Sequence, residues 1–444
     1  MVAAPPPENP QAAGAGAPQG IRAIRVAVDA GRMSPRALVS GQVATAARLD
    51  RSINAFAAFT RDGAVDVPDM TGPLAGTTFA VKDVIAVQGA VNRFGLPDYP
   101  GFKAERSAEV VRRLERAGAT LLGTTRMDAL GLGDGPASPS QRVINPVDVK
   151  TSPGGSSSGS ASAVAGGLCT FALGTDCGGS VRGPAAHCGI VGFKPTNGVV
   201  PSDGVHLLSR TCDAVGILGL DVEDVALLHE IIVDRGGAML RNGALDAARI
   251  GFVPPDGLPP LDDEVSRDYM YVLDRLRSRG MSLGEVRLGD FFETSGTLRS
   301  IIVAHEFESE FLTGLDRVAW DYAEAAGLLR DVGSSAYQAA LSVSGDLRAD
   351  SLRRMAGFDV LLLPTQPAMP APVGHRELAG STPSWVLRQG FNLLGWPAVT
   401  LPIHAGRQRL SAGLQIVAPS GCDRQVLAVA VQVEGMMKSA PPRV

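Results

Sequence analysis

The sequence predicts an α/β protein that forms a single large domain, and three observations support this class. Hydrophobic residues make up 45% of the 444 residues and charged residues 19%, which is the balance of a globular chain with a sizeable core. Apolar strand-like runs at 79–87 and 120–122 enclose a helical segment at 105–117, which is the strand–helix–strand order of α/β proteins. No linker-like segment divides the rest of the chain. Residues 1–20, rich in Ala, Pro and Gly, are expected to be a disordered leader, and residues 21–444 to form the domain.

Local signals predict the first elements. A helix is expected at 34–49, because Ser34 is a favourable N-cap and Pro35 suits the first helical position. The run at 79–87 is apolar except for one charged pair that begins at Lys82, so it predicts a buried strand that carries a lysine.

The next helix, at 105–117, places Val110, Val111 and Leu114 on one stripe, and Gly118 is expected to end it. Apolar periodicity predicts the elements that follow. Strands are expected at 168–173, 250–253, 358–363, 398–403 and 413–417, and helices at 161–165, 224–232, 262–279, 424–436 and, with breaks, 299–354. The stretch at about 255–350 is expected to be a more variable helical region of the same domain.

Charge and cysteine usage exclude several classes of function. The net charge is −4 and no block of Lys or Arg exists, which argues against a nucleic-acid partner or an anionic membrane surface. Five scattered cysteines do not form a disulfide framework, so a reducing, cytoplasmic location is expected. The N-terminus lacks the features of a signal peptide, and the most apolar stretch, 161–174, is too short to span a bilayer.

Two clusters of Gly and Ser, at 152–160 and 174–180, could carry chemistry, and each alone has other interpretations. A flexible linker would disrupt a core at this place in the chain. A phosphate-binding loop would need a Gly-Lys-Ser/Thr ending that is absent. Residues 155–159 match the G-x-S-x-G pattern of the esterase nucleophile elbow, but Pro146 and Pro153 precede them where a buried strand is required.

A further interpretation pairs the clusters with Lys82. Ser180 ends a Gly-rich turn, and the N–H groups of Gly178 and Gly179 can converge on a developing oxyanion, because glycine lacks a Cβ. A lysine acts as a base only when neutral, and burial in the apolar run would lower its pKa. A second serine, Ser156 or Ser157, could relay the proton from Ser180 to Lys82. The order of Lys82 and the two Gly/Ser clusters along the chain is more specific than any one of these features alone.

Long motifs occupy residues 81–83, 152–167, 171–182, 184–186, 188–196, 213–216 and 391–398. With these motifs the sequence strongly resembles the amidase signature family. The match is dense over 76–232, recognisable from 358 to the closing helix, and thin between. The resemblance implies one large domain with a mixed, twisted β-sheet that helices cover on both faces.

The resemblance also implies roles for single residues. Ser180 matches the acylated nucleophile, Ser156 the bridging serine on a cis peptide bond, and Lys82 the base of a Ser–cis-Ser–Lys triad. The backbone N–H groups of Cys177, Gly178, Gly179 and Ser180 match the oxyanion hole. No cofactor and no metal is implied.

For some positions the sequence leaves more than one role open. Arg182 could bind a substrate carboxylate or pair with Asp176, and Ser157 is a further candidate for a substrate or structural role. Cys177 stands where the family commonly has Thr, and it is interpreted as a packing residue because only its backbone is needed. His187 replaces a residue that is usually apolar or aromatic, and a change of local shape is favoured over a second base.

The leading hypothesis is an amidase that hydrolyses a small carboxamide to a carboxylic acid and ammonia or an amine through a seryl acyl-enzyme. The alternative is a protein like the ammonia-generating subunit of an amidotransferase, which works with a partner. A non-catalytic scaffold of the same fold is the third hypothesis, and an intact triad argues against it. The expected partner is a small amide substrate, without nucleic acid or membrane. The sequence specifies neither the amide nor the oligomeric state, a homodimer included.

Overall fold

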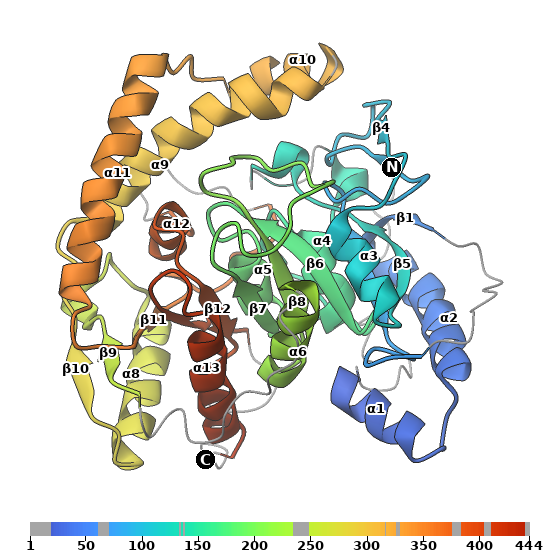
Figure 1. The fold of residues 1–444 in the computed structure, drawn as a ribbon, viewed down its shortest axis with the longest axis horizontal. Coiled ribbons are helices and arrows are strands. Elements are labelled where there is room, and N and C mark those ends of the chain that lie inside the picture. Colours follow the sequence, from blue (N-terminus) through green and yellow to red (C-terminus); the bar gives the residue numbers. More distant parts are fainter. Residues whose placement is uncertain are drawn as a thin grey trace.

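A mixed β-sheet runs through the whole molecule in the computed structural model (Figure 1). The structure describes residues 19–60, 71–132, 135, 138–233, 248–315, 317–325, 329–374, 383–403 and 410–439. Within these residues the large sheet has eleven strands in the order β1-β5-β2-β6-β8-β7-β12-β13-β11-β9-β10, and β3 pairs with β4 separately. The predicted α/β class and the mixed sheet are confirmed.

The strands of the large sheet are short and most of them are buried. They are β1 (Phe56–Phe59), β2 (Thr78–Lys82), β5 (Thr120–Thr125), β6 (Phe171–Asp176), β7 (Val191–Lys194), β8 (Ala214–Gly219), β9 (Ile250–Phe252), β10 (Leu283–Glu285), β11 (Val360–Pro364), β12 (Ala398–Leu401) and β13 (Leu414–Val417). Strand β2 is parallel to both β5 and β6, whereas β6 is antiparallel to β8. The small sheet consists of β3 (Val91–Asn92) and β4 (Phe102–Lys103).

Helices cover both faces of the sheet. The α-helices are α1 (Ile21–Asp29), α2 (Pro35–Ile53), α3 (Glu109–Arg116), α4 (Ser158–Ala165), α5 (Arg182–His187), α6 (Val222–Val233), α8 (Asp263–Ser278), α9 (Phe291–Glu306), α10 (Arg317–Ala325), α11 (Ser334–Arg354), α12 (Val386–Leu393) and α13 (Asp423–Lys438). Short 3₁₀ or π turns lie at Ala129–Gly131, Pro139–Gln141, Pro255–Gly257, Phe307–Phe311 and Leu312–Gly314.

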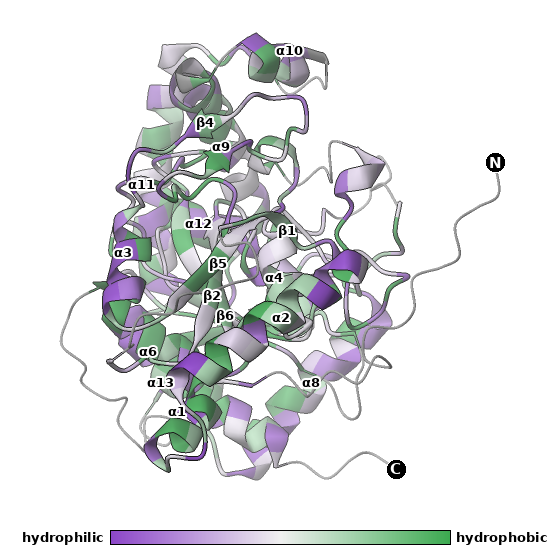
Figure 2. Cartoon of the chain, turned by 90° about the vertical axis from the view of Figure 1, so that its right-hand side faces the viewer, coloured by the Kyte–Doolittle hydropathy of each residue, from purple (hydrophilic) through white to green (hydrophobic). Residues whose placement is uncertain are grey.

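Alternation along β2 assigns side chains to the two faces. Phe79 and Val81 pack in the same apolar cluster as α3, α6 and α13. Ala80, between them, packs with α2, α4 and α5 on the opposite face. Since side chains along a strand alternate, Lys82 belongs to the face of Ala80, where α4 lies. In Figure 2 the strands β2, β5 and β6 lie behind helix α2, whose ribbon carries both hydrophobic and hydrophilic residues.

The region at 255–350 is largely helical, as predicted. It contains α8, α9, α10 and most of α11, and α9 packs along α11 and α12 (Figure 1). Strand β10 was not predicted there, because its three residues carry no apolar run. Glu306, at the end of α9, accepts hydrogen bonds from Ser209 Oγ, from Thr211 N at 3.1 Å and from Tyr337 Oη at 2.8 Å. These contacts tie α9 and α11 to the loop before β8.

Several predicted boundaries change in the structure. The strand expected at 79–87 ends at Lys82, where the N–H groups of Val84 and Ile85 turn back to the Lys82 carbonyl at 2.7 and 2.8 Å. Lys82 therefore ends its strand. The helix expected at 105–117 starts later, at Glu109, and the one at 299–354 is three helices that begin at Phe291.

The remaining predicted elements occur within a few residues of their expected bounds. Helix α2 begins at Pro35, and the Ser34 hydroxyl accepts from Ala37 N at 3.2 Å, as a capping residue does. Strands β1, β3, β4, β7 and β8 and helices α1, α5 and α12 were not predicted either. Most of the expected leader, residues 1–18, lies outside the described residues. Among the described helices, none is both long and apolar enough to cross a bilayer.

Candidate active site

Lys82 is a buried lysine at the carboxyl end of β2, and its side chain is 1% exposed in relative terms. Its Nζ lies 2.8 Å from Ser156 Oγ and 2.9 Å from Thr175 Oγ1. Thr175 is on the neighbouring strand β6, which runs parallel to β2, so both residues lie near the same sheet edge. The sheet thus places the amine against two hydroxyl groups.

Ser156 lies in a tight turn just before α4. The peptide bond between Gly155 and Ser156 is cis, as the family resemblance implied. The Ser156 carbonyl accepts from Asp128 N at 3.1 Å. A Cβ at Gly155 would lie 1.7 Å from Asp128 Oδ2, so only glycine fits this approach. The turn is therefore packed closely against the segment after β5.

Ser180 lies in the loop between β6 and α5, beside the turn that holds Ser156. Its carbonyl accepts from Ser157 N at 3.2 Å, which joins the two loops. A small cavity is lined by Lys82, Ser156, Thr175, Ser180 and neighbouring side chains. Ser180 also lines a much larger pocket of about 690 Å³. The serine therefore stands between the buried amine and a space large enough for a small substrate.

The Asp176 carboxylate organises the loop that carries Ser180. It accepts from the N–H of Gly179 at 2.8 Å, of Val181 at 3.1 Å and of Arg182 at 3.2 Å. The Arg182 guanidinium donates to both carboxylate oxygens, at 2.8 and 3.0 Å. Asn392 Nδ2 donates to Asp176 Oδ1 at 2.9 Å.

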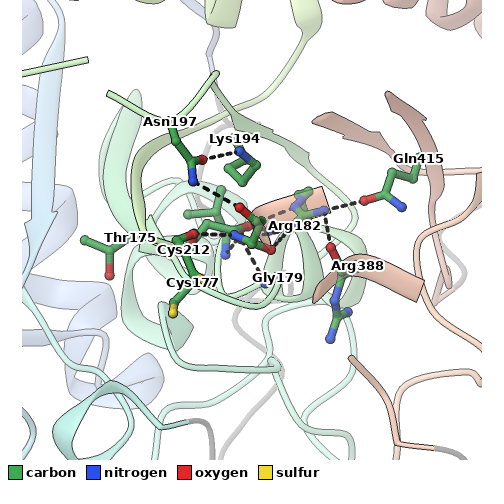
Figure 3. Close-up of polar contacts among 12 residues, drawn as sticks. Thr175, Cys177, Gly179, Arg182, Lys194, Asn197, Cys212, Arg388 and Gln415 are labelled. Atoms are coloured by element: carbon green, nitrogen blue, oxygen red, sulfur yellow. Dashed lines mark hydrogen bonds and ion pairs between the residues drawn. The ribbon is translucent and has the colours of Figure 1, made fainter. Parts of the chain in front are cut away.

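Figure 3 shows Arg182 at the centre of this network, with contacts to Gln415 and to the backbone of Arg388. Burial by itself would raise the pKa of Asp176, but Arg182, Asn392 and Lys194 outweigh burial and hold it below its usual range. Of the two roles left open for Arg182, the geometry supports the structural one.

Two titratable groups surround the small cavity. Burial lowers the pKa of Lys82, and the charge of Asp213 is the first of several that oppose this shift. Burial also raises the pKa of Asp213 to about 6, against the opposing charge of Lys82. Asp213 lines the same cavity as Lys82, and its Oδ2 accepts from Leu208 N at 2.9 Å. The pKa of the lysine is thus set by burial and by a neighbouring carboxyl.

The larger pocket has a polar wall. It is lined by Arg299, Arg330 and Arg388, and by His187 and Gln366, among other residues. His187 Nδ1 donates to the Ser152 carbonyl at 2.9 Å, and its Nε2 lies 3.0 Å from the side-chain amide of Gln366. Burial lowers the pKa of His187 to about 4, so the ring is neutral at neutral pH. Both ring nitrogens are engaged, which agrees with a shaping role.

The structure brings Lys82, Ser156 and Ser180 to one cavity. Ser157 is not among the residues that line this cavity, and its hydroxyl donates to the Thr175 carbonyl at 3.3 Å. Gly179 differs from the expectation for an oxyanion hole, because its N–H donates to Asp176. For the N–H groups of the other three residues, Cys177, Gly178 and Ser180, the expected role in an oxyanion hole stays a prediction.

Sequence reasoning did not single out Thr175, Asp213, Arg299, Arg388 and Gln366 as site residues. Thr175 and Asp213 stand inside motifs that carried the family resemblance, so their motif context was the available signal. Arg299 lies where the match to the family is thin, and no sequence signal placed it. Only the packing of α9 and α12 against the Ser180 loop brings the two arginines there.

The fold is that of enzymes that act on the C–N bond of amides. The model of the family described as Amidase matches residues 42–427. The chain belongs to this family, the amidase signature family.

Named relatives and solved structures agree with that family. A glutamyl-tRNA(Gln) amidotransferase subunit from Symbiobacterium thermophilum is 33% identical over 405 residues, which cover 81% of this chain and 82% of the relative. The protein of the same name from Prochlorococcus marinus is 31% identical and covers 83% of this chain and 86% of the relative.

Among solved structures, one described as a crystal structure of amidase is 31% identical, with a TM-score of 0.81, and covers 94% of this chain and 100% of that chain. Peptide amidase from Stenotrophomonas maltophilia has a TM-score of 0.79 at 24% identity, and covers 96% of this chain and 98% of that chain. At that identity the likeness supports the fold.

Proposed function

We propose that this protein is an amidase that hydrolyses a small carboxamide to a carboxylic acid and ammonia or an amine. The proposal rests on one observation above all, the 2.8 Å contact between Lys82 Nζ and Ser156 Oγ beside a cavity that Ser180 also lines. A buried amine, a relay hydroxyl and a candidate nucleophile are the parts that acyl transfer requires.

The proposed reaction starts with neutral Lys82. Ser180 Oγ attacks the amide carbonyl while its proton passes to Ser156 Oγ, and the proton of Ser156 passes to Lys82 Nζ. The resulting ammonium returns a proton by the same route to the leaving nitrogen, the C–N bond breaks, and an acyl ester on Ser180 remains. Water then attacks the ester while Lys82 again accepts a proton through Ser156. The ester C–O bond breaks, the acid leaves, and Lys82 returns the proton through Ser156 to Ser180 Oγ, which restores the free enzyme. Burial supports the first step, because it lowers the pKa of Lys82.

The negative charge that develops on the carbonyl oxygen requires donors that are already in place. We assign this role to the N–H groups of Cys177, Gly178 and Ser180. The Asp176 carboxylate, held by Arg182, fixes the turn in which these groups lie. Its contribution is to hold the loop rigid, since Asp176 and Arg182 are themselves fully buried.

Labelling with a fluorophosphonate, followed by mass spectrometry of the labelled peptide, tests the nucleophile. We expect modification of Ser180 in the wild type and no labelling in Ser180→Ala. Ser156→Ala should lower the labelling rate by orders of magnitude. Ser157→Ala, the matched change one residue away, should lower it far less, because the Ser157 hydroxyl faces a carbonyl group. Undiminished labelling of Ser180→Ala would refute the assignment.

The names of the relatives favour a second candidate, a protein like an amidotransferase subunit that passes ammonia to a partner. The two functions differ in what the isolated chain does. An amidase releases ammonia from its substrate alone, whereas the second candidate requires copurification with a partner and ammonia release that depends on it. Ammonia assays with the purified chain, with and without proteins captured from its source, separate the two.

A further inference from the structure

The charged side chains described around the larger pocket beside Ser180 are all positive. Among its described lining residues, Arg299, Arg330 and Arg388 are cationic and none is Asp or Glu. His187 is neutral, because burial lowers its pKa to about 4. A pocket with this lining attracts an anion and repels a cation.

Arg299, on α9, is held against the loop before Ser180. Its Nε donates to the Cys177 carbonyl at 2.8 Å, and its Nη2 lies 3.5 Å from Cys177 Sγ. Burial raises the pKa of Cys177 well above its usual value, so the thiol is neutral. Neither of these two contacts neutralises the guanidinium. They fix its orientation. The Asp213 carboxyl also acts on Arg299, but it lines the small cavity and not this pocket.

Arg388, on α12, approaches the same loop from another element. A Cβ at Gly179 would lie 2.2 Å from Arg388 Nε, and one at Gly183 would lie 2.6 Å from Arg388 Nη1. A Cβ at Gly178 would likewise lie 2.7 Å from Arg299 Nη2. The two guanidinium groups therefore pack against consecutive glycines that directly precede Ser180, and any side chain at either glycine would displace them.

This placement limits where an anion can stand on a substrate. Consecutive Cα atoms are about 3.8 Å apart, so the two cations lie within roughly two residues' length of the nucleophile. An anionic group bound there must be only a few bonds from the carbonyl that Ser180 attacks. Planar guanidinium groups recognise a carboxylate through paired hydrogen bonds, which suits a carboxylate better than a neutral amide.

A buried amide group adds a polar contact to the same wall. Gln366 is 2% exposed, lines the pocket, and meets His187 through one of its amide atoms at 3.0 Å. The other end of the amide has no hydrogen-bond partner within the described residues. A buried polar group of this kind is normally satisfied, so it points to a ligand that is polar as well as anionic.

We propose that the pocket selects monoamides of short dicarboxylic acids, with Arg299 and Arg388 receiving the carboxylate while Ser180 attacks the carboxamide. This inference rests on the proposed amidase function and names its substrate class. It also separates two kinds of anionic amide. An amino-acid amide such as glutamine carries an ammonium group as well, and the described lining residues include no carboxylate to receive one.

The test compares matched substrates that differ only in charge. We expect kcat/KM for succinamate to exceed that for the neutral diamide succinamide at least 10-fold in the wild type, and malonamate to exceed malonamide likewise. Arg299→Gln and Arg388→Gln should bring these ratios close to one, and Arg299→Lys should retain part of the preference. Arg317→Gln is the control, because that side chain is 81% exposed on α10. Its ratios should equal those of the wild type.

A second measurement needs no variant. Succinate should slow fluorophosphonate labelling of the wild-type protein, and the uncharged succinamide should slow it much less. If the neutral diamides were hydrolysed as fast as the matching monoamide acids, and succinate did not protect Ser180 from labelling, the substrate class would be overturned while the amidase function stands. Absence of all amide hydrolysis together with absence of Ser180 labelling would instead overturn the function itself. Glutamine turned over faster than succinamate would also overturn the inference.

Discussion

Asp176 and Arg182 form a buried ion pair in which both side chains are fully inaccessible to solvent. Arg182 Nη2 lies 2.8 Å from Asp176 Oδ1, and Arg182 Nε lies 3.0 Å from Asp176 Oδ2. The same carboxylate accepts the backbone N–H of Gly179 and Val181, which flank Ser180. The ion pair at the end of β6 thus helps to fix the conformation of the loop that carries Ser180, the proposed nucleophile.

Breaking this pair should destabilise the fold. Arg182→Met leaves a buried carboxylate without its main partner, which typically costs about 3–5 kcal/mol in the free energy of unfolding. The pair keeps the pKa of Asp176 below its ordinary value of 3.8, so its contribution is fully present above that pH and is lost as the pH falls further. Denaturant unfolding at pH 7 measures the loss. The double variant with Asp176→Asn should recover part of it, and a loss below about 1 kcal/mol in Arg182→Met would contradict the argument.

Removal of the amine should abolish most of the activity. In Lys82→Met the proton of Ser156 has no acceptor, and a positioned general base contributes typically about 10²–10⁴-fold to rate. The wild-type kcat/KM should fall as the pH drops through the pKa of Lys82, which burial lowers from 10.5. That limb should be absent from the profile of Lys82→Met. Lys103→Met, at an exposed position on β4, serves as the control and should keep the wild-type profile.

The carboxyl of Asp213 should tune the pH at which the enzyme becomes active. Asp213 is ionised above about pH 6, and its negative charge raises the pKa of Lys82. Asp213→Asn removes that charge, so the pKa of Lys82 falls further and the acid limb of kcat/KM should move to lower pH. The isosteric amide can still accept from Leu208 N. Asp98→Asn, an exposed change, should leave the limb in place, and an unmoved or upward-moved limb in Asp213→Asn would exclude this role.

The hydroxyl of Thr175 should position the lysine. Lys82 Nζ donates to Thr175 Oγ1 at 2.9 Å, and Thr175→Val removes this contact while nearly keeping the shape of the side chain. We expect kcat to fall about 10-fold with little change in KM, since a net hydrogen bond is worth roughly 1 kcal/mol and more when one partner is charged. Thr175→Ser keeps the hydroxyl and should restore most of kcat. Equal kcat values for Val and Ser at this position would show that the contact is dispensable.

Two helical glycines should respond in opposite ways to the same substitution. A Cβ at Gly159, on α4, would lie 2.4 Å from the Ala55 carbonyl oxygen and 2.6 Å from that of Arg126. Both obstacles are backbone atoms, so Gly159→Ala should cost about 1–3 kcal/mol or more. Gly345, on α11, has no atom within 4 Å of such a Cβ. Gly345→Ala should stabilise the helix by about 0.5–1 kcal/mol, and thermal unfolding of both variants checks the contrast.

Elements with strong local signals agreed with the sequence predictions. Helix α2 begins at Pro35 because Ser34 and Pro35 suit its first turn in any context. The strand that carries Lys82 was expected to run to residue 87, but it ends at Lys82. The apolar run continues beyond the turn at Asp83 because the segment after the turn is also buried. Apolar residues indicate burial, and burial alone does not show where a strand ends.

Ser156 and Ser157, the two candidates for the bridging serine, show what a sequence motif can and cannot distinguish. Ser156 and Ser157 are adjacent, alike and both fully buried, so composition does not separate them. The family resemblance pointed to Ser156, and the geometry places the Ser156 hydroxyl at Lys82 and the Ser157 hydroxyl at a carbonyl. The different partners of these neighbouring side chains follow from the backbone of the turn, which only the folded chain defines.

By itself, the sequence determined the α/β class, the family, and the order of Lys82, Ser156 and Ser180 as candidate site residues, because these depend on local patterns and on long motifs. The tertiary structure decided which groups meet: Thr175 and Asp213 at Lys82, Arg182 at Asp176, and Arg299 beside Cys177 across 122 positions of the chain. Charge and hydrogen bonding act over a few ångströms of space, whatever the separation along the chain. The lining of the larger pocket therefore follows from how α9 and α12 pack, which no local pattern encodes.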